Sequence, residues 1–413
     1  MVYMKINLPE IKKMLSVLFA LAVLLVASCS KSDDVTIPSV SGDEDDDQTT
    51  ATIDSSYRYQ LPVIVHVFYK DRSDTNQYVA YRRISQIIEN VNELWKGRFA
   101  IDGLTSGRDM GVRFFLATVD PEGRRMSTPG VEYIRYDGDY PIDAQEFMRS
   151  KANVNYLWEP NEYINIMMFE FKQSGSGSIT LGLTSLPYSI SGSNPLEGLT
   201  EVSRSRYSKS NLSFCYSSCI NSRYQSAANE SNRYTYYKNV TSQYMTAFDI
   251  NNTIAHELGH YLGLHHTFTE LMTDSGSEPA DSCGDTDYCA DTPSYNIFEY
   301  RQYLAGRQAL MPSPTMRDLA VRYPCDGRGT YIADNFMDYW CDYYTTFTRN
   351  QWQRVRHVLS YSPLIPGPKL GEASANTRAS AGVLLPQSRI VECRAGASMA
   401  GRRIYIRCRR PRQ

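Results

Sequence analysis

The sequence predicts an α+β fold in which helices pack on a twisted, mixed β-sheet. A β-branched run from Leu61 to Tyr69 is typical of a buried strand. Apolar residues recur at helical spacing from Val79 to Phe99, which indicates an amphipathic helix packed on that strand. Val112 to Val119 and Tyr163 to Phe171 read as two further strands. This order of strand, helix, strand and strand favours a layered α/β or α+β domain.

Composition limits the class of protein. The chain has 413 residues, of which 42% are apolar and 21% charged, as is typical of a soluble globular protein with a large core. Its formal net charge is only -2, so the composition gives no support for a nucleic-acid partner, and we expect none.

The N-terminus, residues 1–28, has the pattern of a signal peptide. Basic residues precede an apolar run from Met14 to Ala27 that is too short to span a bilayer stably. The run ends in Leu-Val-Ala-Ser-Cys, which resembles a bacterial lipobox with lipidation at Cys29. We therefore expect an exported lipoprotein, held by Cys29 in the outer membrane and exposed at the cell surface. An ordinary signal peptide with an incidental cysteine is the alternative.

Two polar segments flank the predicted domain at residues 57–366. Residues 29–56 are acidic and lack apolar periodicity, so they indicate a solvated tether, with an inhibitory segment as the alternative. Residues 367–413 end in an arginine-rich run, which we interpret as a poorly ordered tail unrelated to the fold. Contact with an anionic surface is the other interpretation of that tail.

The chemistry of the chain is concentrated in a stretch that starts with Asn251 and Asn252, either of which can cap a helix. His256 and His260 stand four residues apart and so share one helix face, where they can bind one metal ion. Glu257 is one step further round the helix, close enough to act on a water molecule without being a ligand.

A third ligand is expected after the helix. Gly263 permits the left-handed backbone that ends a helix, and the turn can bring His266 back toward the same ion. Three histidine nitrogens with one open position are typical of a catalytic zinc site. His265 would then point away from the ion, beside the site or toward solvent. Histidines that are merely buried in a helix are the alternative explanation.

A candidate substrate-binding strand lies before the helix. Ile179 to Thr184 follows a Gly/Ser loop and could be an edge strand whose backbone pairs with an extended peptide through Thr180, Leu181 and Gly182. An ordinary sheet strand is an equal alternative. Residues 188–248 are rich in Ser, Asn, Tyr and Arg, and we interpret them as an insertion or a loop that covers the cleft.

The run from His256 to His266 fits the eleven-residue metzincin motif. Other segments resemble the pappalysin-like (cytophagalysin) family of metzincins over roughly Leu61 to Leu364. They are His266-Thr267-Phe268, Asp291-Thr292-Pro293, Asn335-Phe336-Met337-Asp338-Tyr339 and Phe347-Thr348-x-x-Gln351. The chain departs from the family in the segment before the helix and in the tail, so substrate preference does not transfer.

The resemblance implies a zinc endopeptidase with a zincin-like fold and a smaller C-terminal subdomain. The ligands would be His256, His260 and His266. Glu257 would take a proton from a water molecule activated by zinc, and Tyr339 would lean toward the oxyanion. Met337 would form the hydrophobic floor of a methionine turn.

Cysteines and acidic residues suggest further structure around the site. Two disulfides are expected among Cys283, Cys289, Cys325 and Cys341, with three pairings open, and Cys215 could pair with Cys219. The resemblance also implies calcium near an acidic loop, although these carboxylates could equally be polar loop residues. They are Asp274, Glu278, Asp281, Asp285, Asp287 and Asp291.

Together these observations predict a monomeric enzyme that hydrolyses peptide bonds in extracellular or surface polypeptides. The alternative from another class is a catalytically silent surface adhesin or binding module on the same scaffold. The complete set of three histidines with Glu257 favours the enzyme.

Overall fold

The sheet is built around β1 (Tyr59–Tyr69), whose long β-branched run is buried over most of its length. β2 (Val112–Leu116) and β3 (Val131–Arg135) pair parallel to its first and second halves on one side. β4 (Ile164–Phe169), buried at every position, pairs parallel to its other side. Such continuous burial is characteristic of parallel strands covered on both faces. The strands predicted from the sequence at β1, β2 and β4 are therefore confirmed.

These observations come from a computed structural model that describes residues 56–97, 104, 107–173, 179–192, 194–203, 206–227, 249–273, 276–310, 315–339, 341–370 and 383–395. All of these residues belong to one compact unit. The predicted signal peptide, Cys29 and nearly all of the predicted tether lie outside the described residues.

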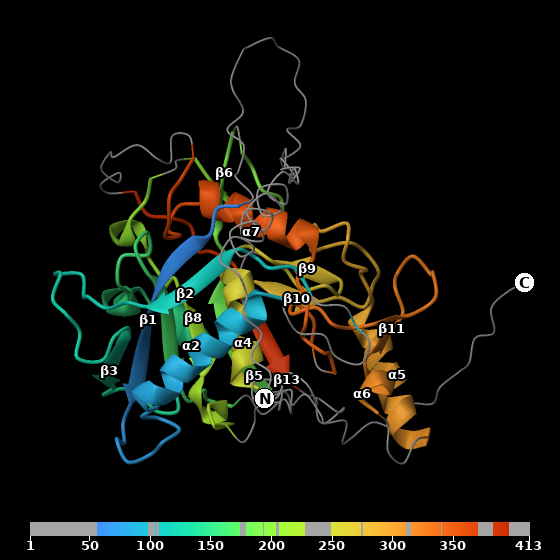
Figure 1. The fold of residues 1–413 in the computed structure, drawn as a ribbon, viewed down its shortest axis with the longest axis horizontal. Helices are drawn as coiled ribbons and strands as arrows, with labels where there is room; N and C mark the ends of the chain where they lie inside the picture. Colours follow the sequence, from blue (N-terminus) through green and yellow to red (C-terminus); the bar gives the residue numbers. More distant parts are fainter. Residues whose placement is uncertain are drawn as a thin grey trace, which may run out of the picture. The chain divides into compact units, whose positions relative to one another are not determined.

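In the other half of the sheet, the strand pairing changes from parallel to antiparallel. β8 (Ser218–Asn221) is parallel to β4, β5 (Ile179–Ser185) is antiparallel to β8, and β13 (Ile390–Ala395) is antiparallel to β5. The strand order is β13-β5-β8-β4-β1-β2, with β3 beside β1 (Figure 1). The predicted mixed sheet is thus confirmed.

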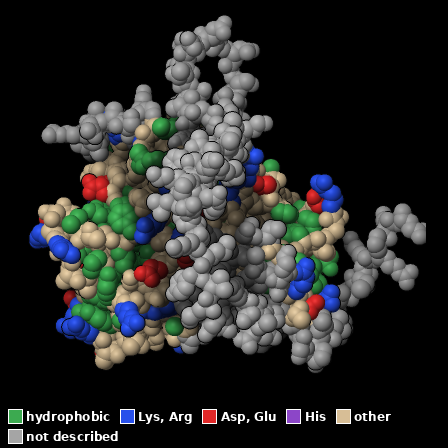
Figure 2. Space-filling model, in the orientation of Figure 1, with side chains coloured by type: hydrophobic (Ala, Val, Ile, Leu, Met, Phe, Trp, Pro, Cys, Tyr) green, Lys and Arg blue, Asp and Glu red, His purple; other side chains and the backbone are tan. Residues whose placement is uncertain are grey.

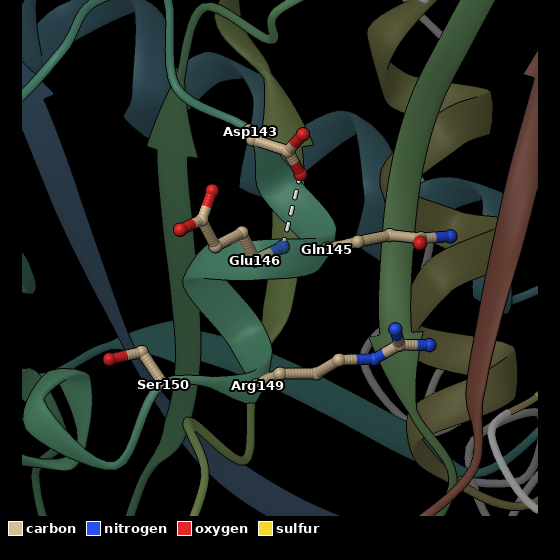
Figure 3. Close-up of a pocket in the computed structure, with 5 residues that line it drawn as sticks. All are labelled: Asp143, Gln145, Glu146, Arg149 and Ser150. Carbon is tan, nitrogen blue, oxygen red and sulfur yellow. Dashed lines mark hydrogen bonds between the residues drawn. The ribbon is translucent and has the colours of Figure 1, made fainter.

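Helices cover both faces of this sheet. α2 (Tyr81–Trp95) and α4 (Ile250–Tyr261) lie together on one face (Figure 1) and are joined by a 3.2 Å hydrogen bond from Asn90 to Asn251. α3 (Ala144–Arg149) lies on the opposite face (Figure 3), where the ring of Phe147 packs 5.2 Å from that of Phe68 in β1. The sheet and α2 together position α4.

Smaller elements complete the described part of the chain. They are η1 (Lys151–Tyr156), β6 (Tyr188–Ile190), β7 (Thr200–Val202), η2 (Lys209–Asn211), η3 (Ser222–Tyr224), β9 (Glu270–Met272), β10 (Ser277–Pro279), α5 (Ile297–Leu310), α6 (Met316–Leu319), β11 (Val321–Arg322), β12 (Tyr331–Ile332) and α7 (Arg349–Tyr361). Thr348 and Gln351 form a reciprocal capping box at the start of α7.

Two predictions about segments are wrong. The expected insertion at residues 188–248 supplies β8, a central strand, while residues 228–248 lie outside the described part. The tail was expected to be unrelated to the fold, yet β13 is a strand of the main sheet. Residues 371–382 and 396–413 of that tail are not among those described.

Charges are mixed on the visible surface. On the face shown in Figure 2, lysine and arginine side chains are scattered with acidic ones between them. Within the described residues, no helix combines the length and apolar character that crossing a membrane requires.

Candidate metal centre

The centre is built on α4, all of whose side chains are buried. The helix begins at Asp249, whose carboxylate accepts a 3.0 Å hydrogen bond from the Asn251 backbone N–H. The sequence-based assignment of the cap to Asn251 or Asn252 is therefore wrong. The Asn251 side chain instead contacts α2 and Asp249, so the start of α4 is tied to its neighbour.

The chain turns sharply after α4. Gly263 adopts φ +90°, where a side chain is strained, and an added Cβ would lie 2.6 Å from Val358 Cγ2. The Leu264 N–H then returns to the Gly259 carbonyl at 2.9 Å. This turn places His266 beside the two helix histidines, as the spacing predicts.

The three histidines converge on one point. The Nε2 atoms lie 2.9 Å apart for His256 and His260, and 3.1 Å apart for His266 and each of the others. Each Nδ1 faces a protein acceptor, namely Phe336 O at 2.7 Å, Leu264 O at 2.8 Å and Glu270 Oε1 at 2.7 Å. Each Nδ1 therefore carries the proton of its imidazole ring and donates it to that acceptor. The Nε2 atoms are left unprotonated, and their three lone pairs face one another.

That arrangement fits a zinc ion. Zinc–nitrogen bonds of about 2.0–2.1 Å in a tetrahedral site place the nitrogens about 3.3 Å apart, close to the separations seen here. Burial lowers the pKa values of His256 and His260 well below their usual range, which favours the neutral imidazoles that bind metals. The three residues could therefore hold one metal ion through three nitrogen atoms.

Glu257 lies beside the cluster with one carboxylate oxygen engaged. Oε2 accepts a hydrogen bond from the hydroxyl of Thr184 in β5, while Oε1 is buried without a hydrogen-bond partner. Burial raises the pKa of Glu257 well above its usual range, and the Thr184 hydrogen bond opposes that shift. A bound cation would also oppose it. The free oxygen is available to accept a proton from a water molecule.

The methionine turn forms the floor of the centre. A Cβ added at Gly259 would lie 2.4 Å from Met337 Sδ, so only glycine allows α4 to sit this close to the turn. The Met337 N–H is held at 2.9 Å by the Asn335 side chain. Met337 therefore lies against α4 at Gly259, and its role as the hydrophobic floor of the site stays a prediction.

A buried ion pair supports the turn from behind. Arg322 Nε lies 3.2 Å from Asp338 Oδ2, and both side chains are almost fully buried. The guanidinium also lies 3.5 Å from the centre of the Tyr300 ring. Asp338 in turn accepts a 2.6 Å hydrogen bond from the backbone N–H of Tyr339, which holds the backbone of Tyr339 in place.

Tyr339 lies beside the three histidines. Its ring centre is 4.4 Å from that of His266 and 5.9 Å from that of His256. Its hydroxyl donates a hydrogen bond to the backbone carbonyl of Glu392 in β13. The structure thus places Tyr339 at the centre and engages its hydroxyl with a carbonyl oxygen.

The candidate substrate strand does not have a free edge. β5 pairs with β8 on one side and with β13 on the other, where Thr180 faces Arg394 and Gly182 faces Cys393. The expectation of unpaired backbone groups on β5 is therefore wrong for this form of the chain. A role for Thr180, Leu181 and Gly182 in substrate pairing stays a prediction.

The histidines outside the ligand set have structural contacts. His265 is buried, with its Nε2 3.1 Å from Arg354 Nη2, so the solvent-facing alternative is wrong. His66 in β1 lies between Glu132 at 2.8 Å and Asn165 at 3.1 Å. His357 Nε2 lies 3.1 Å from the Asn194 carbonyl.

The predicted disulfides are only partly found. Cys283 and Cys325 form a bridge, with a Cα–Cα distance of 5.4 Å. Cys289 and Cys341 are free, and so are Cys215 and Cys219, although all four lie near other cysteines in the sequence. The second bridge of the loop and the Cys215–Cys219 pair are therefore corrections to the sequence-based expectation.

The acidic loop is held by the protein itself. Asp281, Asp285 and Asp291 accept hydrogen bonds from Asn296, Tyr288 and Asn350 respectively, and Asp287 from Thr292 and Cys289. No three carboxylates of the described part of this loop gather as the metal-binding histidines do. Asp274 lies outside the described residues, and calcium stays a prediction.

Sequence reasoning missed two residues of the centre, Glu270 and Thr184. Glu270 follows the last ligand by four residues, and an acidic residue so close to a metal-binding histidine is a usable signal. No local signal identified Thr184, because its contact with Glu257 spans 73 residues.

A separate surface pocket of about 510 Å³ lies beside α3. Its lining residues are Asp143, Gln145, Glu146, Arg149 and Ser150, none of which belongs to the histidine cluster. Asp143 caps α3 by accepting from the Glu146 N–H, while Gln145 and Arg149 point toward the strands at the edge of the sheet (Figure 3).

Comparisons with known proteins agree with this chemistry. Residues 209–360 match the Peptidase_M43 family, described as pregnancy-associated plasma protein-A. An extracellular metalloprotease of Aspergillus fumigatus is 35% identical over 116 residues, which are 28% of this chain and 29% of that protein. One of Arthroderma otae is 32% identical over 111 residues, or 27% of this chain and 32% of that protein. The matched part of the chain thus spans about a third of each relative's length or less.

Among solved structures, the chain is similar to mature mirolysin of Tannerella forsythia in complex with a cleaved peptide. The identity is 20%, the TM-score is 0.46, and the match covers 73% of this chain and 91% of that one. A promirolysin mutant of the same organism matches at 18% identity and a TM-score of 0.43 over 74% of this chain and 81% of that one.

Proposed function

We propose that the chain is a zinc-dependent endopeptidase that cleaves extracellular or surface polypeptides, because residues 209–360 match the Peptidase_M43 family. The observation that carries the proposal is the convergence of three Nε2 lone pairs beside a glutamate with one free oxygen. A bound zinc ion supplies Lewis acidity, which polarises a peptide carbonyl and acidifies water.

Residues of the chain supply the remaining steps. Glu257 Oε1 takes the proton of the attacking water and passes it to the leaving amine. Thr184 holds the other oxygen of that carboxylate and so keeps Oε1 directed into the site. The Tyr339 hydroxyl donates to the substrate carbonyl oxygen as negative charge develops on it.

The substrate is proposed to bind as an extended strand. Its backbone would pair antiparallel to β5 through Thr180, Leu181 and Gly182, which lie directly over α4 and so bring a peptide bond to Glu257. A Cβ added at Gly182 would lie 2.4 Å from Glu257 Oε1, which measures how closely the strand approaches the base.

The test combines zinc analysis with cleavage of an unfolded protein. Replacing Glu257 by glutamine should leave one zinc per chain and, in the chain cut between Leu370 and Val383, lower the cleavage rate at least ~100-fold, the lower end of general-base effects. A chain that binds no zinc, or a Glu257→Gln variant with undiminished activity, would refute the mechanism. Zinc binding with no cleavage by any form of the chain would favour the alternative of a surface binding module.

We also propose that the protein is a lipoprotein anchored in the outer membrane through Cys29, acting as a monomer. The support is the signal-peptide pattern of residues 1–28 and the cysteine that follows it. In a bacterial host, fatty-acid labelling and membrane fractionation should both be lost on Cys29→Ala substitution. Unchanged labelling would contradict the anchor.

A further inference from the structure

The C-terminal strand β13 occupies the side of β5 proposed for the substrate. It runs antiparallel to β5, with Cys393 opposite Gly182 and Arg394 opposite Thr180. An extended substrate would use the same backbone groups of β5. The two cannot bind together.

Cys393 points toward the metal centre. Residues opposite each other in an antiparallel pair share a face, and the missing side chain of Gly182 leaves that face open toward Glu257. Ligand atoms of Cys393, His256 and Glu257 all lie within 4.8 Å of one another. In a zinc site with Zn–S and Zn–N bonds of about 2.3 and 2.0 Å, a sulfur ligand would lie about 3.6 Å from a nitrogen ligand. Cys393 would therefore need to move by about 1 Å at most to become a ligand.

Several contacts besides the pairing with β5 hold β13 in place. The Tyr339 hydroxyl, which the proposed mechanism assigns to the substrate carbonyl, donates to the Glu392 carbonyl. On the opposite face, the Gln145 side chain of α3 donates a hydrogen bond to the Glu392 carboxylate. Ile390 forms a bridge with Gly276, next to β10, so the strand lies between two segments of the chain.

We propose that β13 is an internal occupant of the substrate position and that Cys393 is the fourth ligand of the metal, which holds the full chain inactive. This rests on the proposed function. The site has three nitrogen ligands and one open position, and a thiolate is a strong zinc ligand. A thiolate there takes the place of the attacking water, so the segment is not cleaved. The proton that the Cys393 thiol loses passes to the free oxygen of Glu257 or to solvent.

Covalent connection makes this block effective. A segment tethered covalently to the domain competes at an effective concentration that can reach the millimolar range. A free polypeptide at lower concentration cannot displace it at comparable affinity. Separation of β13 from the domain by proteolysis between Leu370 and Val383 removes that advantage, and the substrate position becomes accessible.

The first test reads metal ligation without activity. The full chain is reconstituted with Co²⁺, and the thiolate-to-cobalt charge-transfer band is recorded in the near ultraviolet. The band should be present in the natural sequence, absent in Cys393→Ser and retained in Cys341→Ser, a matched control with a free cysteine outside the metal-binding groups. All three should bind one Co²⁺. A missing band in the natural sequence, or its persistence in Cys393→Ser, would overturn the proposal.

The second test measures release. A recognition site for a specific protease is inserted between Leu370 and Val383 of the full chain, and cleavage of an unfolded protein is measured before and after cutting. The rate should rise at least ~10-fold after cutting, and Cys393→Ser should raise it without cutting. Equal rates before and after cutting would overturn the inhibitory role. A cobalt band without proteolysis in any form would leave the ligation intact and refute the proposed function.

Discussion

Gly182→Ala tests how closely β5 approaches the proposed base. An added Cβ would lie 2.4 Å from Glu257 Oε1 and 2.7 Å from Cδ and Cγ. Ordinary contacts begin near about 3.5 Å, so the carboxylate must move by about 1 Å. A displacement of that size in a catalytic group can cost about 100-fold in rate, or about 2.7 kcal/mol of activation free energy. Crowding in a packed core costs about 1–3 kcal/mol of stability in addition.

The assay for Gly182→Ala is kcat/KM in the chain cut between Leu370 and Val383, together with zinc content and thermal unfolding. We expect zinc to stay bound while kcat falls. The matched control is Gly284→Ala, where an added Cβ would meet only Thr269 Cγ2 at 3.9 Å and should change neither activity nor stability appreciably. If Gly182→Ala keeps full kcat, Glu257 does not need the position seen here and the reasoning fails.

Three further perturbations probe the surroundings of the centre. Arg322→Met leaves the Asp338 carboxylate buried without its cationic partner and should lower the free energy of unfolding in urea by about 3–5 kcal/mol. Glu270→Gln weakens the hold on His266 and should reduce zinc affinity about 10–100-fold in chelator competition. Burial raises the pKa of Asp287 to about 8, so its folded form favours the proton and its contribution to stability is lost as the pH rises from about 4 through 8. Asp287→Asn should remove the part of the pH-dependent fall in the free energy of unfolding, measured in urea, that is due to Asp287.

Each of these has its own control or contrary result. Arg328→Ala breaks an ion pair with Asp326 that is largely exposed, and it should cost less than about 1 kcal/mol. A comparable loss in both arginine variants would contradict the role of the buried pair. Unchanged zinc affinity in Glu270→Gln would show that His266 is oriented by other contacts. For Asp287→Asn, a pH profile parallel to that of the natural sequence would contradict the raised pKa.

The parts of the fold that the sequence predicts depend on local pattern. The ligand spacing from His256 to His266 is a property of one helix and one turn, and the structure keeps it. β1 and β4 were predictable because continuous β-branched and apolar runs have few other uses. Elements of this kind can be predicted without knowing which segments they pack against.

The parts that were missed depend on distant contacts. β8 has the sequence Ser-Cys-Ile-Asn, a weak strand pattern, and becomes a strand because β4 and β5 flank it. β13 lies about two hundred residues from β5 and pairs with it through backbone groups, which every residue type provides. Cys393 looked like one of several unassigned cysteines, because only the pairing of β13 brings it to His256 and Glu257.

The Cys283–Cys325 bridge links the stability of the chain to the redox state of its surroundings. It closes a loop of 42 residues that contains α5 and Arg322, and hence the support behind the methionine turn. In the chain-entropy treatment, closing such a loop restricts the unfolded chain by about 4 kcal/mol at room temperature. A reducing compartment would forfeit that contribution, whereas an oxidising one preserves it without any enlargement of the apolar core.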